Sequence, residues 1–343
     1  MKTNPIGWCD DKFNPFIGCS KCSPGCENCY AERFAARLAQ NPKTASVYRH
    51  VVDANGHWNG RVYGKWAQWP STSARKGKRI FVGSMCDIFH EDIEFSTLAK
   101  MFSVLSFCQK HTFFFLTKRP ERMHAFFTKF DTERFHKARQ EAARVLSFGS
   151  VELTCWPPTN FWLGVTVCNQ GEVISKIPLL LDTPAAKRFL SVEPLLGPVD
   201  LTRFLPALDW VICGGETGSD ARPMHSDWVR LLRASSLVAG VPFYFKGWGE
   251  WLPSSEVPDD MDVSRYPIGD IGDDGFFIPP PALEIPIRNG VCHEDTVRVG
   301  KEKSGHLIDG REWREFPAQE RETDARTERK REFLEARSGE VSL

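Results

Sequence analysis

Several short runs of almost uninterrupted apolar residues constrain the fold of this chain more than any other feature. Aromatic and β-branched residues dominate them, and polar residues do not alternate with apolar ones inside most of the runs. This pattern is typical of strands that are buried on both faces, as in a parallel sheet covered by helices. The runs occupy residues 79–83, 112–117, 161–167, 187–192, 210–213 and 242–246.

Segments with helical character lie between these runs. Residues 30–40, 95–110 and 131–146 are rich in helix formers, and Ser226 is expected to cap a helix over residues 227–239. Alternation of strands and helices predicts an α/β fold with right-handed crossovers. We expect a partial or complete (β/α) barrel of parallel strands, with a small C-terminal β-rich accessory unit. An open doubly wound sheet is the alternative.

The character of the sequence changes near residue 250. Residues 1–250 carry the barrel pattern, and residues 251–318 are expected to form the accessory segment, with strands near its C-terminal end. Residues 319–343 are highly charged with few apolar anchors. They predict a solvated helix or a disordered tail.

Charge and cysteine usage narrow the classes of function. Lysine plus arginine equals aspartate plus glutamate, at 44 each, so binding of nucleic acid would need a local basic patch. No apolar run approaches membrane-spanning length, and the N-terminus lacks an apolar signal segment. We therefore expect a cytoplasmic protein with no membrane partner. In a reducing compartment, clustered cysteines are more often metal ligands or catalytic thiols than disulfides.

Four of the eleven cysteines lie close together in one loop. We expect a strand near residues 16–17 to lead into this loop. A single zinc ion usually takes two C-x2-C pairs separated by a dozen or more residues, whereas three residues separate them here. Iron–sulfur clusters use such short spacings. The pattern therefore favours a cluster over zinc, and any metal over unliganded thiols. The candidate metal ligands are Cys19, Cys22, Cys26 and Cys29.

The stretch CSPGCENCY resembles the C-x3-C-x2-C loop of the radical S-adenosylmethionine superfamily. The wider chain is similar to a poorly characterised phage and bacterial branch with a three-cysteine motif, through GSMCDIFHE, LTKRPERM, FWLGVTV, LSVEPLLGP, DWVICGGETG and FYFKGWGEW. The resemblance implies a [4Fe–4S] cluster and bound S-adenosylmethionine, which is cleaved to a 5′-deoxyadenosyl radical. Cys26 and Cys29 match in either alignment of the motif. Whether Cys19 or Cys22 completes the triad, or all four ligate, stays open.

Polar and glycine residues gather where the apolar runs end, and the carboxyl ends of parallel strands form the active-site face of α/β folds. By position and by the resemblance, Ser84 and Asp87 are candidates for contact with the amino or ribose groups of the cofactor. Lys118 and Arg119 would neutralise its carboxylate. The remaining candidates are Glu193 for the ribose hydroxyls and Gly214, Gly215 and Glu216 for close backbone approach to the adenine or carboxylate.

The substrate is not evident from the sequence. Tryptophans and basic residues interleave over residues 58–79. Such side chains can stack on bases and contact phosphates, or they can form a partly buried loop with a solvated basic rim. The resemblance favours nucleic-acid modification or repair, with DNA or RNA as a partner and a flavodoxin- or ferredoxin-like electron donor. Two alternatives are a redox or sensing module whose iron–sulfur cluster is fully ligated by cysteine, and a zinc-stabilised nucleic-acid-binding protein.

Overall fold

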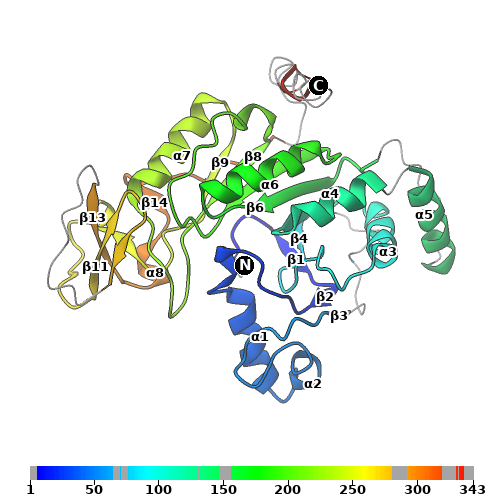
Figure 1. Cartoon of the computed structure of the whole chain (residues 1–343), viewed down its shortest axis with the longest axis horizontal. Coiled ribbons are helices and arrows are strands. Elements are labelled where there is room, and N and C mark those ends of the chain that lie inside the picture. Colours follow the sequence, from blue (N-terminus) through cyan, green and yellow to red (C-terminus); the bar gives the residue numbers. More distant parts are fainter. Residues whose placement is uncertain are drawn as a thin grey trace. The chain divides into compact units, whose positions relative to one another are not determined.

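The computed structural model describes residues 6–64, 70, 76–129, 132–146, 156–279, 292–318, 330 and 332–335 (Figure 1). The chain forms two compact units. The first comprises Met1–Val165 and Pro178–Arg188, and the second comprises Thr166–Ile177 and Phe189–Leu343.

The α/β class is confirmed, and the main sheet is an open half-barrel of seven strands in the order β1-β4-β5-β6-β7-β8-β9. In the first unit, β1 pairs with β4, β4 with β5 and β5 with β6, all in parallel. In the second unit, β8 pairs in parallel with β7 and with β9. The strands are β1 (Asp11–Phe13), β4 (Arg79–Val82), β5 (Thr112–Thr117), β6 (Phe161–Thr166), β7 (Lys187–Val192), β8 (Trp210–Cys213) and β9 (Phe243–Phe245).

An aromatic core holds the first unit together. Phe102 of α3 lies with its ring centroid 4.7 Å from Phe115 of β5, 5.2 Å from Phe126 of α4 and 5.6 Å from Phe161 of β6. All four side chains are fully buried, so each removes a large apolar area from water. The helices of this unit are α1 (Tyr30–Gln40), α2 (Ala45–Tyr48), α3 (Phe95–Ser106), α4 (Pro120–Lys129) and α5 (Thr132–Leu146).

The expected strand at residues 16–17 exists, but it does not belong to the parallel sheet. It is β2 (Phe16–Ile17), which pairs antiparallel with β3 (Tyr63–Gly64). The parallel strand that precedes the cysteine loop is β1. The loop then contains the short 3-10 helix η1 (Pro24–Cys26) and leads into α1.

The second unit carries the accessory β structure that the sequence predicted. A four-stranded antiparallel sheet has the order β10-β13-β11-β12, and β14 pairs with β15. These strands are β10 (Leu252–Pro253), β11 (Ile268–Gly272), β12 (Phe277–Ile278), β13 (His293–Val297), β14 (Leu307–Ile308) and β15 (Arg311–Glu312). The helices of the second unit are α6 (Gln170–Asp182), which extends past the unit boundary, η2 (Leu205–Ala207), α7 (Ser226–Val238), η3 (Ser254–Glu256) and α8 (Lys301–Ser304).

The cap of α7 differs from the expectation by one residue. His225 is the N-cap, because its ring Nδ1 accepts a hydrogen bond of 3.1 Å from the backbone N–H of Asp227, and Ser226 is the first helical residue. Of the charged C-terminal stretch, the structure describes residues 330 and 332–335. Lys330 forms an ion pair with the buried Asp209 there. Across the described residues, no helix is long and apolar enough to cross a membrane.

Candidate functional site

The cysteine loop is anchored by two turns that its sequence dictates. Gly18 has a φ of +91°, and a Cβ atom there would lie 2.2 Å from the carbonyl oxygen of Arg61, so only glycine fits. Further along, the Ser23 hydroxyl accepts a hydrogen bond of 3.3 Å from the Gly25 N–H and caps η1. The loop therefore has a defined path between β2 and α1.

Two of the loop thiols lie within hydrogen-bonding distance of each other. The Cys22 thiol donates to the Cys26 sulfur. This bond is the largest effect that lowers the pKa of Cys26 to about 5, and the nearby charge of Lys118 acts in the same direction, whereas the same bond and burial raise the pKa of Cys22. Cys22 is exposed, and its sulfur is 4.0 Å from the backbone carbonyl of Lys118, where β5 ends. Cys29 is the N-cap of α1 and packs against the hydrophobic cluster beneath that helix.

Cys19 faces a different partner, the guanidinium group of Arg119. The Nη1 of Arg119 donates to the Cys19 sulfur over 3.7 Å. Burial is the largest effect on the Cys19 thiol and raises its pKa to about 11, while Arg119 opposes that shift. The guanidinium also donates from Nε to Glu91 at 2.9 Å and from Nη2 to the Ser20 hydroxyl at 2.7 Å. Arg119 thus holds the cysteine loop against the end of β5.

Asp87, expected to contact the cofactor, is occupied by the chain itself. Its carboxylate accepts hydrogen bonds of 2.8 Å from the Thr117 hydroxyl, 2.9 Å from the Lys118 N–H and 3.0 Å from the Phe89 N–H. Arg119 lies 3.5 Å away. Asp87 therefore ties the turn after β4 to the end of β5.

Ser84 is buried at the end of β4. Its hydroxyl donates to the Asn14 side chain at 3.1 Å, and its carbonyl accepts a bond of 2.7 Å from the Tyr30 hydroxyl. The ends of β4 and β5 therefore bring Ser84, Asp87, Lys118 and Arg119 into one region with the cysteine loop.

In the second unit, Glu193 and Lys246 form an ion pair at the ends of β7 and β9. The pair passes over the end of β8 at Gly214, where a Cβ atom would lie 3.2 Å from Cβ of Lys246 and 3.5 Å from Cδ of Glu193. Both side chains remain about one quarter exposed, at 23% and 24%. Lys246 ends an apolar run as the other candidates do, but nothing in the sequence indicated a contact with the cofactor.

Gly215 and Glu216 serve the fold of the second unit. A Cβ atom at Gly215 would lie 2.0 Å from the carbonyl oxygen of Trp248, so the close approach that glycine permits is taken by the chain's own backbone. The buried Glu216 carboxylate accepts bonds of 2.8 Å and 2.6 Å from the Arg222 guanidinium. The Glu250 side chain in turn accepts from the Gly218 N–H at 2.8 Å.

The donor set of the cysteine loop suits an iron–sulfur cluster. All of the described cysteines are free thiols, and four of them occur on this one loop, where Arg119 supplies an N–H donor to the Cys19 sulfur. Within the described residues, no three Cys, His, Asp or Glu side chains are grouped as the ligands of one metal ion are.

A family comparison matches residues 3–317, which is most of the chain. The chain belongs to the DUF5131 family. That family is described as "protein of unknown function". Searches of the curated proteins and of the solved structures found no match.

The part of the basic and aromatic region that the structure describes serves mainly local packing and ion pairs. Trp58 is half-buried, and Arg79 pairs with Asp10 at 2.8 Å, as Lys78 does with Asp11. The buried Trp8, N-terminal to this region, packs on Phe81. The predicted contributions of Lys65, Trp66, Trp69 and Arg75 lie outside the described residues.

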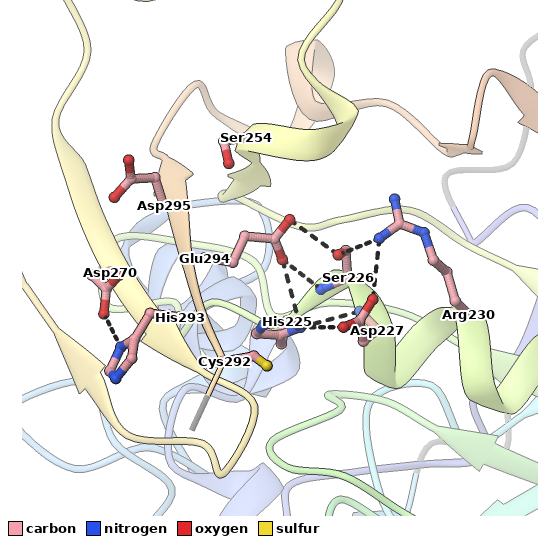
Figure 2. A pocket seen from close by; sticks show the side chains of 10 residues that line it. All are labelled: His225, Ser226, Asp227, Arg230, Ser254, Asp270, Cys292, His293, Glu294 and Asp295. Atoms are coloured by element: carbon pink, nitrogen blue, oxygen red, sulfur yellow. Dashed lines mark hydrogen bonds and ion pairs between the residues drawn. The ribbon is translucent and has the colours of Figure 1, made fainter. Parts of the chain in front are cut away.

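The structure also contains a polar region that the sequence did not predict, because its residues are far apart along the chain. A hollow of about 430 Å³ in the second unit lies between the start of α7 and β13 (Figure 2). Glu294 accepts bonds of 2.9 Å and 3.0 Å from the N–H and hydroxyl of Ser226, and Asp270 lies 2.6 Å from Nδ1 of His293. The Glu294 carboxylate thus stabilises the N-terminus of α7, which is a structural role.

Proposed function

We propose that this DUF5131 protein is a radical S-adenosylmethionine enzyme with a [4Fe–4S] cluster on the loop from Cys19 to Cys29. The observation that carries the proposal is that four free cysteines lie on this one loop, beside the buried Arg119, which donates an N–H to the Cys19 sulfur. When bound, the cluster would supply the electron that cleaves S-adenosylmethionine to methionine and a 5′-deoxyadenosyl radical.

The chain's own residues would hold and orient these groups. Arg119 keeps the loop closed through Ser20 and Cys19, while Asp87 fixes the backbone of Lys118. Lys118, whose charge lowers the pKa of Cys26, is a candidate for the cofactor's carboxylate.

Nucleic acid is the substrate class that we favour, with modification or repair as the outcome. A flavodoxin- or ferredoxin-like protein would supply the electrons, and the reducing cytoplasm suits a loop of free thiols. The cluster would be oxygen-sensitive, because cysteine-ligated clusters of this kind lose iron on oxidation.

The test is anaerobic purification and reconstitution, followed by reduction with dithionite in the presence of S-adenosylmethionine. We expect about four iron and four sulfide per chain, and iron-dependent formation of 5′-deoxyadenosine. Cys26→Ser and Cys29→Ser should abolish both, whereas Cys292→Ser, an exposed thiol outside the loop, should change neither. A stable cluster that never cleaves the cofactor would sink the proposal, as would zinc in place of iron.

A four-ligand redox or sensing cluster is the second candidate, because Cys22 pairs with Cys26 on the same loop. Single serine substitutions at Cys19 and Cys22 separate the two candidates. If the loop holds a three-cysteine cluster, one of these two variants retains the full iron content. Loss of the cluster in both variants would favour the four-ligand module.

A further inference from the structure

Ser20 lies in the cysteine loop with its hydroxyl between two buried donors. Its Oγ accepts a hydrogen bond of 2.7 Å from Nη2 of Arg119 and lies 2.8 Å from Nε2 of His90. Arg119 is 5% exposed and His90 is 3% exposed, whereas Ser20 itself is half-buried. Two inaccessible side chains therefore converge on one hydroxyl at the edge of the loop.

Hydrogen bonding fixes the direction of the contact with His90. The ring Nδ1 accepts a bond of 3.2 Å from the backbone N–H of Asp92, so it carries no proton. A neutral imidazole then has its only proton on Nε2, which donates to Ser20. Burial first, and then the charge of Arg119, lower the pKa of His90 and favour this neutral form. His90 consequently cannot act as a base towards Ser20, which excludes a Ser–His nucleophile here.

The Ser20 hydroxyl can still donate one hydrogen bond. A hydroxyl has two acceptor sites and one donor, and Arg119 and His90 occupy both acceptor sites. Its O–H is therefore free to donate to a group outside these contacts. Accepting two bonds polarises the hydroxyl and strengthens it as a donor. Arg119 is itself fixed by Glu91 and Asp87, so the orientation of the hydroxyl is preset.

We infer that the Ser20 hydroxyl donates a hydrogen bond to a sulfur of the cluster proposed above, and that Arg119 and His90 are positioning residues for that bond. This inference rests on the proposed function. Hydrogen bonds to the sulfurs of an iron–sulfur cluster stabilise the more negative, reduced state and raise the reduction potential. The network thus sets how readily the cluster takes up an electron.

The test is a redox titration of the reconstituted full-length protein, followed by the electron paramagnetic resonance signal of the reduced cluster. Ser20→Ala should retain iron and sulfide but shift the midpoint to lower potential. Ser20→Thr keeps the hydroxyl and should titrate close to the wild type. Ser23→Ala is the matched control, because Ser23 lies in the same loop but caps η1.

The outcomes separate this inference from the proposed function. Absence of a cluster in the wild type refutes the proposed function, whereas an unchanged midpoint in Ser20→Ala refutes only the role of Ser20. Equal shifts in the alanine and threonine variants would also refute it, because they would reflect loop packing. If Ser20→Ala cannot hold the cluster, His90→Leu takes its place: a smaller shift in the same direction supports the inference, and no shift overturns it.

Discussion

At the scale of single residues, Asp87 is the clearest case of a side chain whose role in the fold can be tested apart from chemistry. Its carboxylate receives three hydrogen bonds from Thr117, Lys118 and Phe89. Asp87→Asn turns an amide NH2 group towards these donors, so we expect a loss of about 1–3 kcal/mol in the free energy of unfolding. Urea denaturation of the metal-free protein measures it.

The matched control is Asp92→Asn, because the Asp92 side chain is 57% exposed. A substitution at such a surface position should change stability by less than about 0.5 kcal/mol. If both variants were equally stable, the carboxylate of Asp87 would not be holding the turn after β4. Asp87 would then again be a candidate for contact with the cofactor, as its place at the end of a strand indicates.

The residue scale also shows what the sequence could not predict about the site. Ser84, Asp87, Lys118 and Arg119, which follow strands in the sequence, lie in one region with the cysteine loop. Their partners were not predictable, because Glu91 and Ser20 become neighbours of Arg119 only through tertiary folding. Polar side chains at strand ends serve structure and chemistry alike, and only their hydrogen bonds distinguish the two.

At the scale of elements, strands were predicted well because burial on both faces leaves an unmistakable apolar run. β5, β7 and β8 have the predicted bounds, and β4 and β6 end one residue early. Helix α1 also matches, whereas α3 ends at Ser106 rather than at residue 110. The short strands β10 to β12 went unrecognised in an Asp-, Pro- and Gly-rich segment, because β10 and β12 have only two residues each and because β10 and β11 pair with β13, which is remote in the sequence.

The path of the cysteine loop gives a prediction at this scale. Gly18→Ala places a Cβ atom 2.2 Å from the Arg61 carbonyl at a φ of +91°, so β2, β3 and the loop cannot keep their packing. We expect a loss of more than about 2 kcal/mol in unfolding free energy, since the positive φ alone costs 1–2 kcal/mol. Iron content after reconstitution should fall with it.

Gly60→Ala is the control for this substitution. Gly60 also has a positive φ, of +81°, but a Cβ atom there would meet nothing within 4 Å. It should cost about 1 kcal/mol and leave the iron content unchanged. Equal losses in the two variants would mean that backbone strain, and not the contact with Arg61, governs the loop. Thermal unfolding and iron analysis on the same samples decide between these explanations.

At the scale of the whole molecule, the balance of charge limits how a nucleic-acid substrate can be held. With 44 basic and 44 acidic side chains, the chain has no net charge to attract a polyanion. Two of the basic groups at the start of β4, Lys78 and Arg79, are already paired with carboxylates. Binding must therefore come from a few local contacts and from stacking or hydrogen bonding to bases.

This limit predicts a shallow dependence of nucleic-acid affinity on salt. About two phosphate contacts lower affinity roughly tenfold between 50 and 200 mM salt, whereas six or more lower it by about a thousandfold or more. Fluorescence anisotropy with a labelled single strand and a labelled duplex, across that salt range, measures the slope. We expect a loss near tenfold for whichever form binds. A thousandfold loss would show that a local basic surface binds the nucleic acid despite the zero net charge of the chain. Substitutions of single lysines and arginines would then locate this surface, because each should reduce the slope of log affinity against log salt concentration by about one phosphate contact.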